Sequence, residues 1–202
     1  MKKLLLTSTG FTNPKLAQEF LKLVNKPASD TKVIFVPTAA RTEEELFYVN
    51  ECKRELLELG IKSESVLDYN LDRKLTNEEI SGVDVIYIAG GNTFYLMQKL
   101  RESGFGDIVK ELVSNGIIFL GVSAGSVVAG PDISIAGPYD PNDVGMTDFS
   151  GLHLTEIVTN PHYTDNDKDI VVDFSNRLPY KVLPLTDNQA LLQVDENISV
   201  IE

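Results

Sequence analysis

Short hydrophobic runs alternate along the chain with segments whose hydrophobic residues recur every three or four positions. The first kind of segment predicts strands, and the second predicts amphipathic helices. Several runs are hydrophobic without interruption, which is typical of strands buried on both faces of a parallel sheet. The predicted strands are 4–6, 33–36, 65–67, 85–88, 117–120, 157–159 and 182–185, followed by a terminal hairpin of 190–194 and 198–201.

Helix boundaries are marked by local capping signals. Asn13 followed by Pro14 predicts a helix start, and Thr42 with Glu45 forms a capping box for a helix through Leu59, which Gly60 ends. Further helices are predicted near 77–80 and 168–174. The alternation predicts an α/β fold with three layers, in which helices flank a mostly parallel sheet. Without a repeat or a linker, residues 1–202 form one predicted domain.

Charge and composition narrow the functional classes. The net charge is −12 with 18 basic residues that form no cluster, so we expect no nucleic-acid partner. No hydrophobic stretch is long enough for a membrane span, and the run at 4–6 is too short for a signal peptide. The single cysteine, Cys52, fits a reducing compartment, so we expect a cytoplasmic protein.

The sharpest local motif is Gly121-Val122-Ser123-Ala124-Gly125, directly after a predicted buried strand. A strand, a tight turn and a helix form the setting of a nucleophile elbow, in which the serine hydroxyl is lifted clear of the sheet. The Ala124 amide could then donate to an oxyanion. The alternative is an ordinary glycine-rich turn between a strand and a helix.

A second glycine turn, Gly90-Gly91-Asn92-Thr93, also follows a buried strand. Its amides could supply the other oxyanion donor, with Gly91 as the candidate. A phosphate-binding turn is the alternative, but neither a dinucleotide fingerprint nor a P-loop lysine is present.

A serine nucleophile requires a base and an acid that orients it. Of the two histidines, His162 follows a predicted strand end, where parallel sheets carry their sites, whereas His153 lies in Leu-His-Leu. The loop 131–151 offers four acids, and local pattern does not distinguish them. They are Asp132, Asp140, Asp143 and Asp148.

Taken together, the segments 90–94, 121–125 and 160–164 resemble the peptidase E (aspartyl dipeptidase) family of serine peptidases in order and spacing. This resemblance implies a fold like that of the class I glutamine amidotransferases, with catalysis by Ser123 and His162. It also implies a triad acid in the intervening loop. Ungapped matching back from 160–162 puts that acid on Asp140, with Asp143 as the second choice.

The resemblance further implies hydrolysis of dipeptides with N-terminal Asp, without a cofactor or metal, by a monomer or homodimer. Family members hold the aspartate side chain with an arginine beyond the histidine. Here Lys168 is the nearest cation and Arg177 the second, and lysine lacks the planar fork of arginine. We expect Asn92, Thr93 and Lys168 to contact the peptide substrate.

Three other functions remain compatible with these residues. The first is an esterase of the α/β-hydrolase type, which shares the chain order Ser, Asp, His. Such esterases carry a His-Gly-Gly-Gly segment, and this chain has none. A β-aspartyl peptidase related to the cyanophycinases is the second. The third is a non-catalytic member of the fold that binds a ligand in the same cleft.

Overall fold

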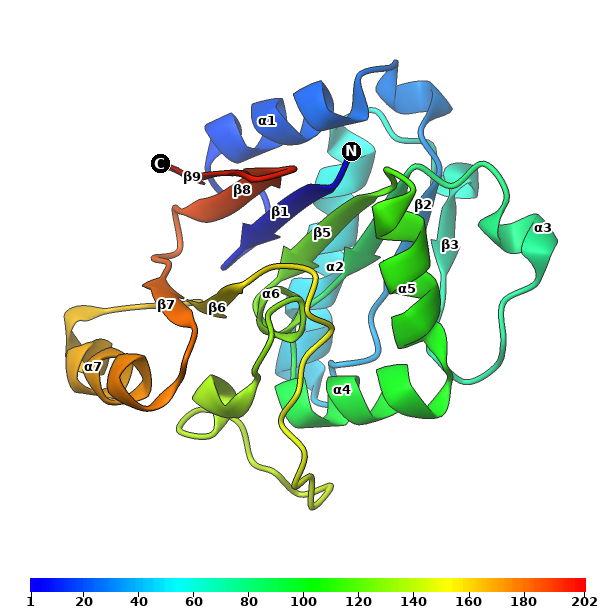
Figure 1. The fold of residues 1–202 in the computed structure, drawn as a ribbon. Helices are drawn as coiled ribbons and strands as arrows, with labels where there is room; N and C mark the ends of the chain where they lie inside the picture. Colours follow the sequence, from blue (N-terminus) through cyan, green and yellow to red (C-terminus); the bar gives the residue numbers. More distant parts are fainter.

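A seven-stranded sheet runs through the centre of the protein in the computed structural model, which describes residues 1–202 (Figure 1). The strand order is β3-β2-β4-β5-β1-β8-β9. The first five strands in this order pair in parallel, whereas β8 pairs antiparallel with both β1 and β9. The strands are β1 (Lys3–Thr7), β2 (Val33–Val36), β3 (Val66–Asp68), β4 (Val85–Ile88), β5 (Ile118–Val122), β8 (Ala190–Val194) and β9 (Asn197–Ile201). The predicted α/β fold with a mostly parallel sheet is confirmed.

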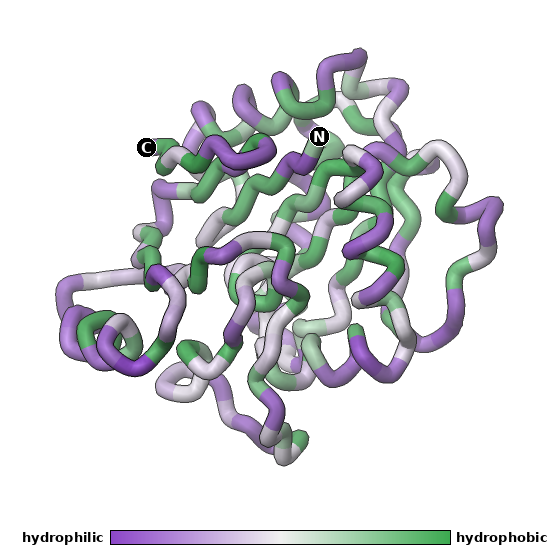
Figure 2. Tube along the Cα trace, in the orientation of Figure 1, coloured by the Kyte–Doolittle hydropathy of each residue, from purple (hydrophilic) through white to green (hydrophobic).

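Helices cover both faces of this sheet. On one face, α1 (Pro14–Val24) and α2 (Glu43–Glu58) pack against alternate strand residues such as Phe35 and Leu120. On the other face, α4 (Thr93–Glu102), α5 (Phe105–Ser114) and α6 (Ala124–Val128) pack against Ile86 and Phe119. The central strands β2, β4 and β5 are therefore buried on both faces, and the hydropathy colouring along them is mostly green (Figure 2).

The helix starts follow the predicted signals. Asn13 accepts a hydrogen bond from the amide of Lys15, and Pro14 begins α1. Thr42 and Glu45 form the predicted capping box of α2. Most predicted strand and helix boundaries lie within one or two residues of the observed ones, and the helix predicted over 168–174 extends three residues further.

A smaller two-stranded parallel sheet, β6 (Ile157–Asn160) and β7 (Lys181–Pro184), lies beside the main one, with α7 (Lys168–Arg177) connecting its strands. The remaining helix is α3 (Asn77–Ile80), and the single-turn 3-10 helices are η1 (Ala28–Asp30), η2 (Ser63–Ser65), η3 (Ser134–Ala136) and η4 (Asp165–Asp167). Residues 131–151 form the predicted long loop, with η3 as its only helical turn.

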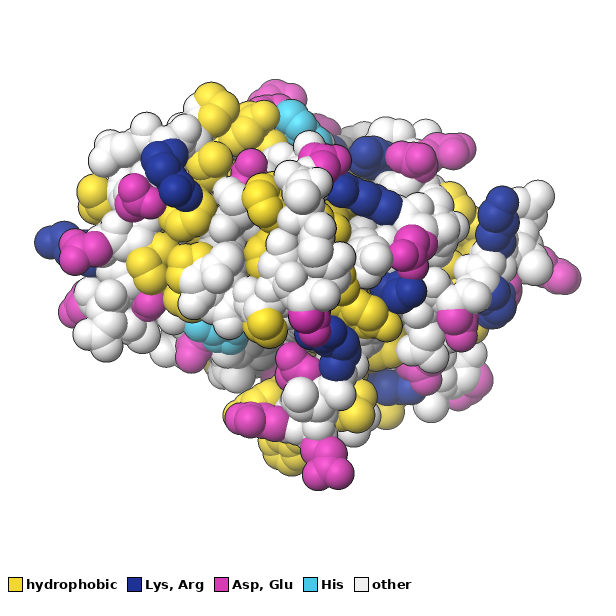
Figure 3. All heavy atoms as spheres, turned by 90° about the horizontal axis from the view of Figure 1, so that it is seen from below, with side chains coloured by type: hydrophobic (Ala, Val, Ile, Leu, Met, Phe, Trp, Pro, Cys, Tyr) yellow, Lys and Arg dark blue, Asp and Glu magenta, His cyan; other side chains and the backbone are white.

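Viewed from below in Figure 3, acidic and basic side chains lie interspersed over the surface, and no basic patch stands out. No helix is both long and apolar enough to cross a membrane. The segments that follow β1, β4 and β5 all leave the sheet at the same edge, because these strands are parallel neighbours. That edge carries the candidate site.

Candidate active site

Ser123 occupies a sharply bent turn between β5 and α6. Its φ of 50° and ψ of −114° lie outside the regions that non-glycine residues prefer. The turn is held by the Ser123 amide, which donates to the carbonyl of Thr7 at 3.0 Å. It is also held by the Ser126 hydroxyl, which donates to the carbonyls of Thr7 and Gly121. This is the strained geometry expected of a nucleophile elbow.

The flanking glycines are required by close backbone contacts. A Cβ atom on Gly125 would lie 2.0 Å from the carbonyl oxygen of Ile88, and one on Gly121 would lie 2.5 Å from the carbonyl oxygen of Gly125. Backbone atoms of neighbouring strands cannot move aside as a flexible side chain can. Glycine is therefore required at 125 for the elbow to fit against β4, and at 121 for it to fit against the start of α6.

Gly125→Ala is expected to destabilise the protein by at least about 3 kcal/mol, because the added methyl overlaps backbone that cannot yield. Urea unfolding measures the change. Gly145→Ala is the control: Gly145 has a φ of +66° but open space around its Cβ position, so about 1 kcal/mol is expected. A Gly125→Ala protein as stable as the control would contradict the packing described here.

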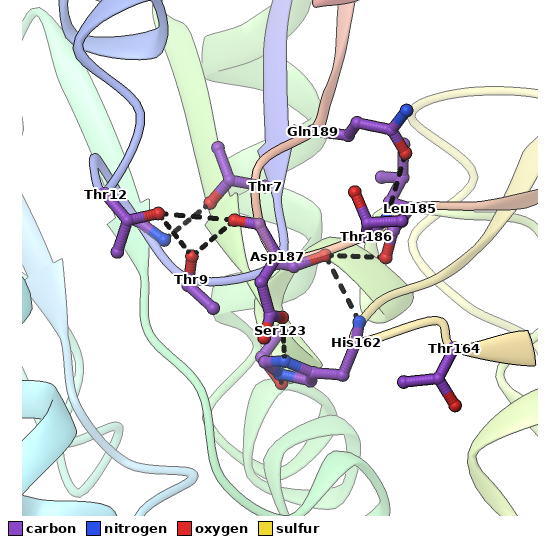
Figure 4. Close-up of polar contacts among 12 residues, drawn as sticks. Thr7, Thr9, Thr12, Ser123, His162, Thr164, Leu185, Thr186, Asp187 and Gln189 are labelled. Carbon is purple, nitrogen blue, oxygen red and sulfur yellow. Dashed lines mark hydrogen bonds and ion pairs between the residues drawn. The ribbon is translucent and has the colours of Figure 1, made fainter. Parts of the chain in front are cut away.

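Ser123, His162 and Asp187 form a continuous chain of hydrogen bonds (Figure 4). The Ser123 Oγ lies 2.9 Å from His162 Nε2, and His162 Nδ1 lies 2.7 Å from Asp187 Oδ1. A carboxylate only accepts, so Nδ1 carries the proton toward Asp187 and Nε2 is free to accept from the serine hydroxyl. The arrangement has the connectivity of a Ser-His-Asp triad.

Hydroxyl groups in the segment after β1 hold the histidine and the aspartate in place. The buried Ser8 hydroxyl donates to the carbonyl of Leu185 at 3.0 Å and accepts from the amide of His162 at 3.2 Å. Thr9 and Thr12 both donate to the backbone carbonyl of Asp187 (Figure 4). His162 has a φ of 57°, and the Ser8 bond helps to hold this uncommon backbone conformation.

The acid at the histidine differs from the predicted one. Asp140 does not contact His162; its carboxylate accepts from the amide of Thr93 at 2.7 Å, at the start of α4. There it satisfies a helix amide that lacks an intrahelical acceptor, and burial raises the pKa of the Asp140 carboxyl. The second choice, Asp143, forms an ion pair with Arg41.

The three residues expected to contact substrate do not line the pocket that contains Ser123. Asn92 and Thr93 are buried, and the Asn92 side chain caps α4 by accepting from Tyr95 while donating to the carbonyl of Pro141. Lys168 is exposed at the start of α7 and does not line the pocket that contains Ser123. The side chain of Asn92 is therefore occupied by capping α4 and by holding loop 131–151.

The two candidate oxyanion donors lie beside the serine. Gly91 lines the same pocket as Ser123, has a φ of +133°, and its amide donates to no acceptor within the protein. Ala124 is the first residue of α6, and no side chain caps that end. The preceding Gly90 packs against the serine: a Cβ there would lie 3.1 Å from Ser123 Cβ.

A pocket of about 720 Å³ opens on the serine. Its lining comes from α2, from the segment after β1 and from the Ser123–His162–Asp187 group. Cys52 also borders the pocket, but it is buried, and burial raises the pKa of its thiol to about 11. Because the thiolate is the reactive form of cysteine, Ser123 rather than Cys52 is the nucleophile candidate of this pocket.

The second histidine has a separate environment. His153 is exposed and its Nε2 lies 2.8 Å from Glu156 Oε1. It is not part of the pocket.

Comparison with known proteins identifies the family of this site. The sequence model of peptidase family S51 matches residues 4–201, nearly the whole chain. The chain belongs to peptidase family S51. It is 30% identical to an uncharacterized peptidase of Listeria innocua, over 98% of this chain and 95% of that protein. It is 33% identical to Peptidase E of Haemophilus influenzae, over 79% of this chain and 72% of that protein.

Solved structures agree with this family assignment. A protein of Listeria monocytogenes EGD-e assigned to peptidase E superposes with a TM-score of 0.83 at 27% identity, covering 100% of this chain and 98% of that chain. A peptidase of an acI-B1 actinobacterium shares the fold, with a TM-score of 0.63 and 19% identity, over 100% of this chain and 87% of that one. The family supports a serine-type peptidase, and the peptidase E resemblance of the sequence is confirmed.

Proposed function

We propose that this member of family S51 hydrolyses short peptides through an acyl-enzyme formed on Ser123. The observation that carries the proposal is the hydrogen-bond chain from Ser123 through His162 to Asp187, at 2.9 and 2.7 Å, inside a pocket of about 720 Å³. A pocket of that size holds a ligand of a few residues, within the roughly 300–1,000 Å³ of typical small-molecule sites.

In the first half of the reaction, Ser123 Oγ attacks the peptide carbonyl while its proton passes to His162 Nε2. The Gly91 and Ala124 amides donate to the oxyanion of the tetrahedral intermediate. The C–N bond then breaks, and the leaving amine takes the proton from His162. Asp187 holds the proton on Nδ1 throughout, which keeps the imidazole in the reactive tautomer.

In the second half, water attacks the acyl-enzyme ester. His162 takes a proton from the water, and the tetrahedral intermediate collapses with return of the proton to Ser123 Oγ. The products are a free carboxylic acid and the unchanged serine. No group outside the chain is needed to balance these steps.

Labelling and a peptide panel test this function together. A fluorophosphonate is expected to label Ser123, identified by mass spectrometry of the modified peptide. Asp-Leu, Glu-Leu, Ala-Leu and Leu-Leu are then compared for release of free leucine. Dipeptides with N-terminal Asp are the substrates that the family resemblance implies. The proposal is refuted if the fluorophosphonate does not label Ser123 and no dipeptide of the panel releases leucine.

Ser8→Ala is expected to lower kcat by about 10–100-fold with KM little changed, because the backbones around His162 and Asp187 lose a shared anchor. Steady-state kinetics on the best dipeptide of the panel measures both constants. Ser114→Ala, which removes an exposed hydroxyl on α5, is the control. Wild-type kcat in a folded Ser8→Ala protein would show that this anchor is dispensable.

A further inference from the structure

The wall of the pocket formed by α2 is acidic. Glu45, Glu51 and Glu55 line it together with one arginine, Arg54. The charge of Arg54 is already offset, since its guanidinium binds Glu51 at 2.6 Å and also pairs with Glu58. Arg54 therefore does not supply a free positive charge for a substrate carboxylate.

Glu55 has the fewest hydrogen-bond donors among the three α2 carboxylates of the pocket. The Glu45 carboxylate accepts from the backbone amides of Arg41 and Thr42, and Glu51 pairs with Arg54. The Oε2 atom of Glu55 accepts from the amide of Phe11 at 2.9 Å, whereas Oε1 has no donor and Glu55 forms no ion pair. Glu55 is therefore held by a single donor, and its Oε1 atom can accept another.

The Glu55 carboxyl is partly withdrawn from water, and the cation nearest to it along α2, Arg54, already pairs with Glu51 and Glu58. The residue is only partly exposed, and burial raises the pKa of its carboxyl. A carboxylate that is partly removed from water is stabilised when a cationic donor reaches its free oxygen. The segment after β1 that contacts Glu55 contains no lysine or arginine; it reads Ser8-Thr9-Gly10-Phe11-Thr12.

We propose that Glu55 binds a primary ammonium group of the peptide substrate, foremost the free α-ammonium of its N-terminal residue. This inference rests on the proposed function, because it takes the pocket of Ser123 as the peptide site. An ammonium group carries three donors and a full charge, so it satisfies the free Oε1 atom and offsets the excess negative charge of this wall. Glu55 thereby selects peptides with an unblocked amino terminus.

Binding to the Ser123→Ala protein tests the proposal without turnover. Calorimetry gives the Kd of Leu-Leu, N-acetyl-Leu-Leu and N-acetyl-Lys-Leu. We expect Leu-Leu to bind about 10–100-fold more tightly than its acetylated form, as a charged hydrogen bond provides. When Glu55→Gln is added to Ser123→Ala, the Kd of N-acetyl-Leu-Leu is expected to exceed that of Leu-Leu by no more than about threefold. Glutamine retains an acceptor for Phe11, so the fold and melting temperature should persist.

Glu58→Gln is the matched control, because it removes the same charge one helical turn away and outside the pocket. It should leave the ratio at the wild-type value. If N-acetyl-Lys-Leu binds as well as Leu-Leu and loses affinity in Glu55→Gln, the ammonium comes from the side chain, and ammonium recognition by Glu55 still holds.

Two results would overturn the proposal. One is equal affinity for Leu-Leu and N-acetyl-Leu-Leu, and the other is an unchanged ratio in a folded Glu55→Gln protein. If either result is found while the fluorophosphonate labels Ser123 in the wild-type protein, only the role of Glu55 is rejected and the proposed function stands. Loss of both labelling and peptide binding would reject the proposed function with it.

Discussion

Ser123→Ala is expected to lower kcat for the best dipeptide by roughly 10⁵–10⁶-fold, the loss seen when a triad nucleophile is removed. The serine hydroxyl makes its side-chain hydrogen bond to His162, and the backbone contacts of the elbow do not depend on it. The melting temperature should therefore stay near the wild-type value. Steady-state kinetics and a thermal melt measure the two quantities, and retention of more than about a tenth of wild-type kcat would exclude Ser123 as the nucleophile.

The histidines provide the internal comparison for this experiment. His162→Ala should be about as damaging as Ser123→Ala, and the double variant no worse, because residues of one catalytic unit do not contribute additively. His153→Ala removes only an exposed contact with Glu156 and should be nearly silent. Equal losses in the two folded histidine variants would contradict the assignment of His162.

Much of the fold could be predicted because its main determinants are local. A strand such as β4 is covered by helices on both faces, so its sequence is uniformly hydrophobic and its position is unambiguous. The helix starts at Pro14 and Glu43 are set by neighbouring side chains. Sequence alone did not show that β6 and β7 form a separate sheet, since that depends on packing between distant segments.

The candidate nucleophile Ser123 and candidate base His162 were recognisable because each lies within two residues of a strand end in a distinctive motif. The contact of Asp187 with this histidine was not predicted, because Asp187 lies 25 residues beyond His162, in a Thr-Asp-Asn turn between β7 and β8. Asp and Asn are common in turns for local reasons, so this composition carries no catalytic signal. Its position just after the end of β7 was the available clue, by the same rule that favoured His162.

Asp140, the acid selected by sequence matching, contacts the start of α4 instead of the histidine. It joins loop 131–151 to the start of α4 through the amide of Thr93, and Asn92 adds a bond to the carbonyl of Pro141. These bonds hold the turn that contains Gly91, the proposed oxyanion donor. An acid at this position can therefore matter for activity without touching the histidine.

Substituting asparagine for each aspartate separates these two roles. Asp187→Asn is expected to lower kcat by about 10⁴-fold, because an amide favours the wrong imidazole tautomer while it preserves the shape of the side chain. Asp140→Asn keeps an oxygen that accepts from the Thr93 amide, so kcat should fall by less than about tenfold. Steady-state kinetics on the same dipeptide measures both, and thermal melts confirm that both variants are folded.

The reverse order of effects would contradict the assignment. A loss of about 10⁴-fold in folded Asp140→Asn with near-normal turnover in Asp187→Asn would mean that Asp140 reaches the histidine during catalysis. Asp143→Asn serves as the control, because Asp143 pairs with Arg41 at an exposed position and should change kcat little. Asp140→Ala then extends the series: without any acceptor for Thr93, it should lose more activity than Asp140→Asn, whereas a triad acid would give similar losses with both substitutions.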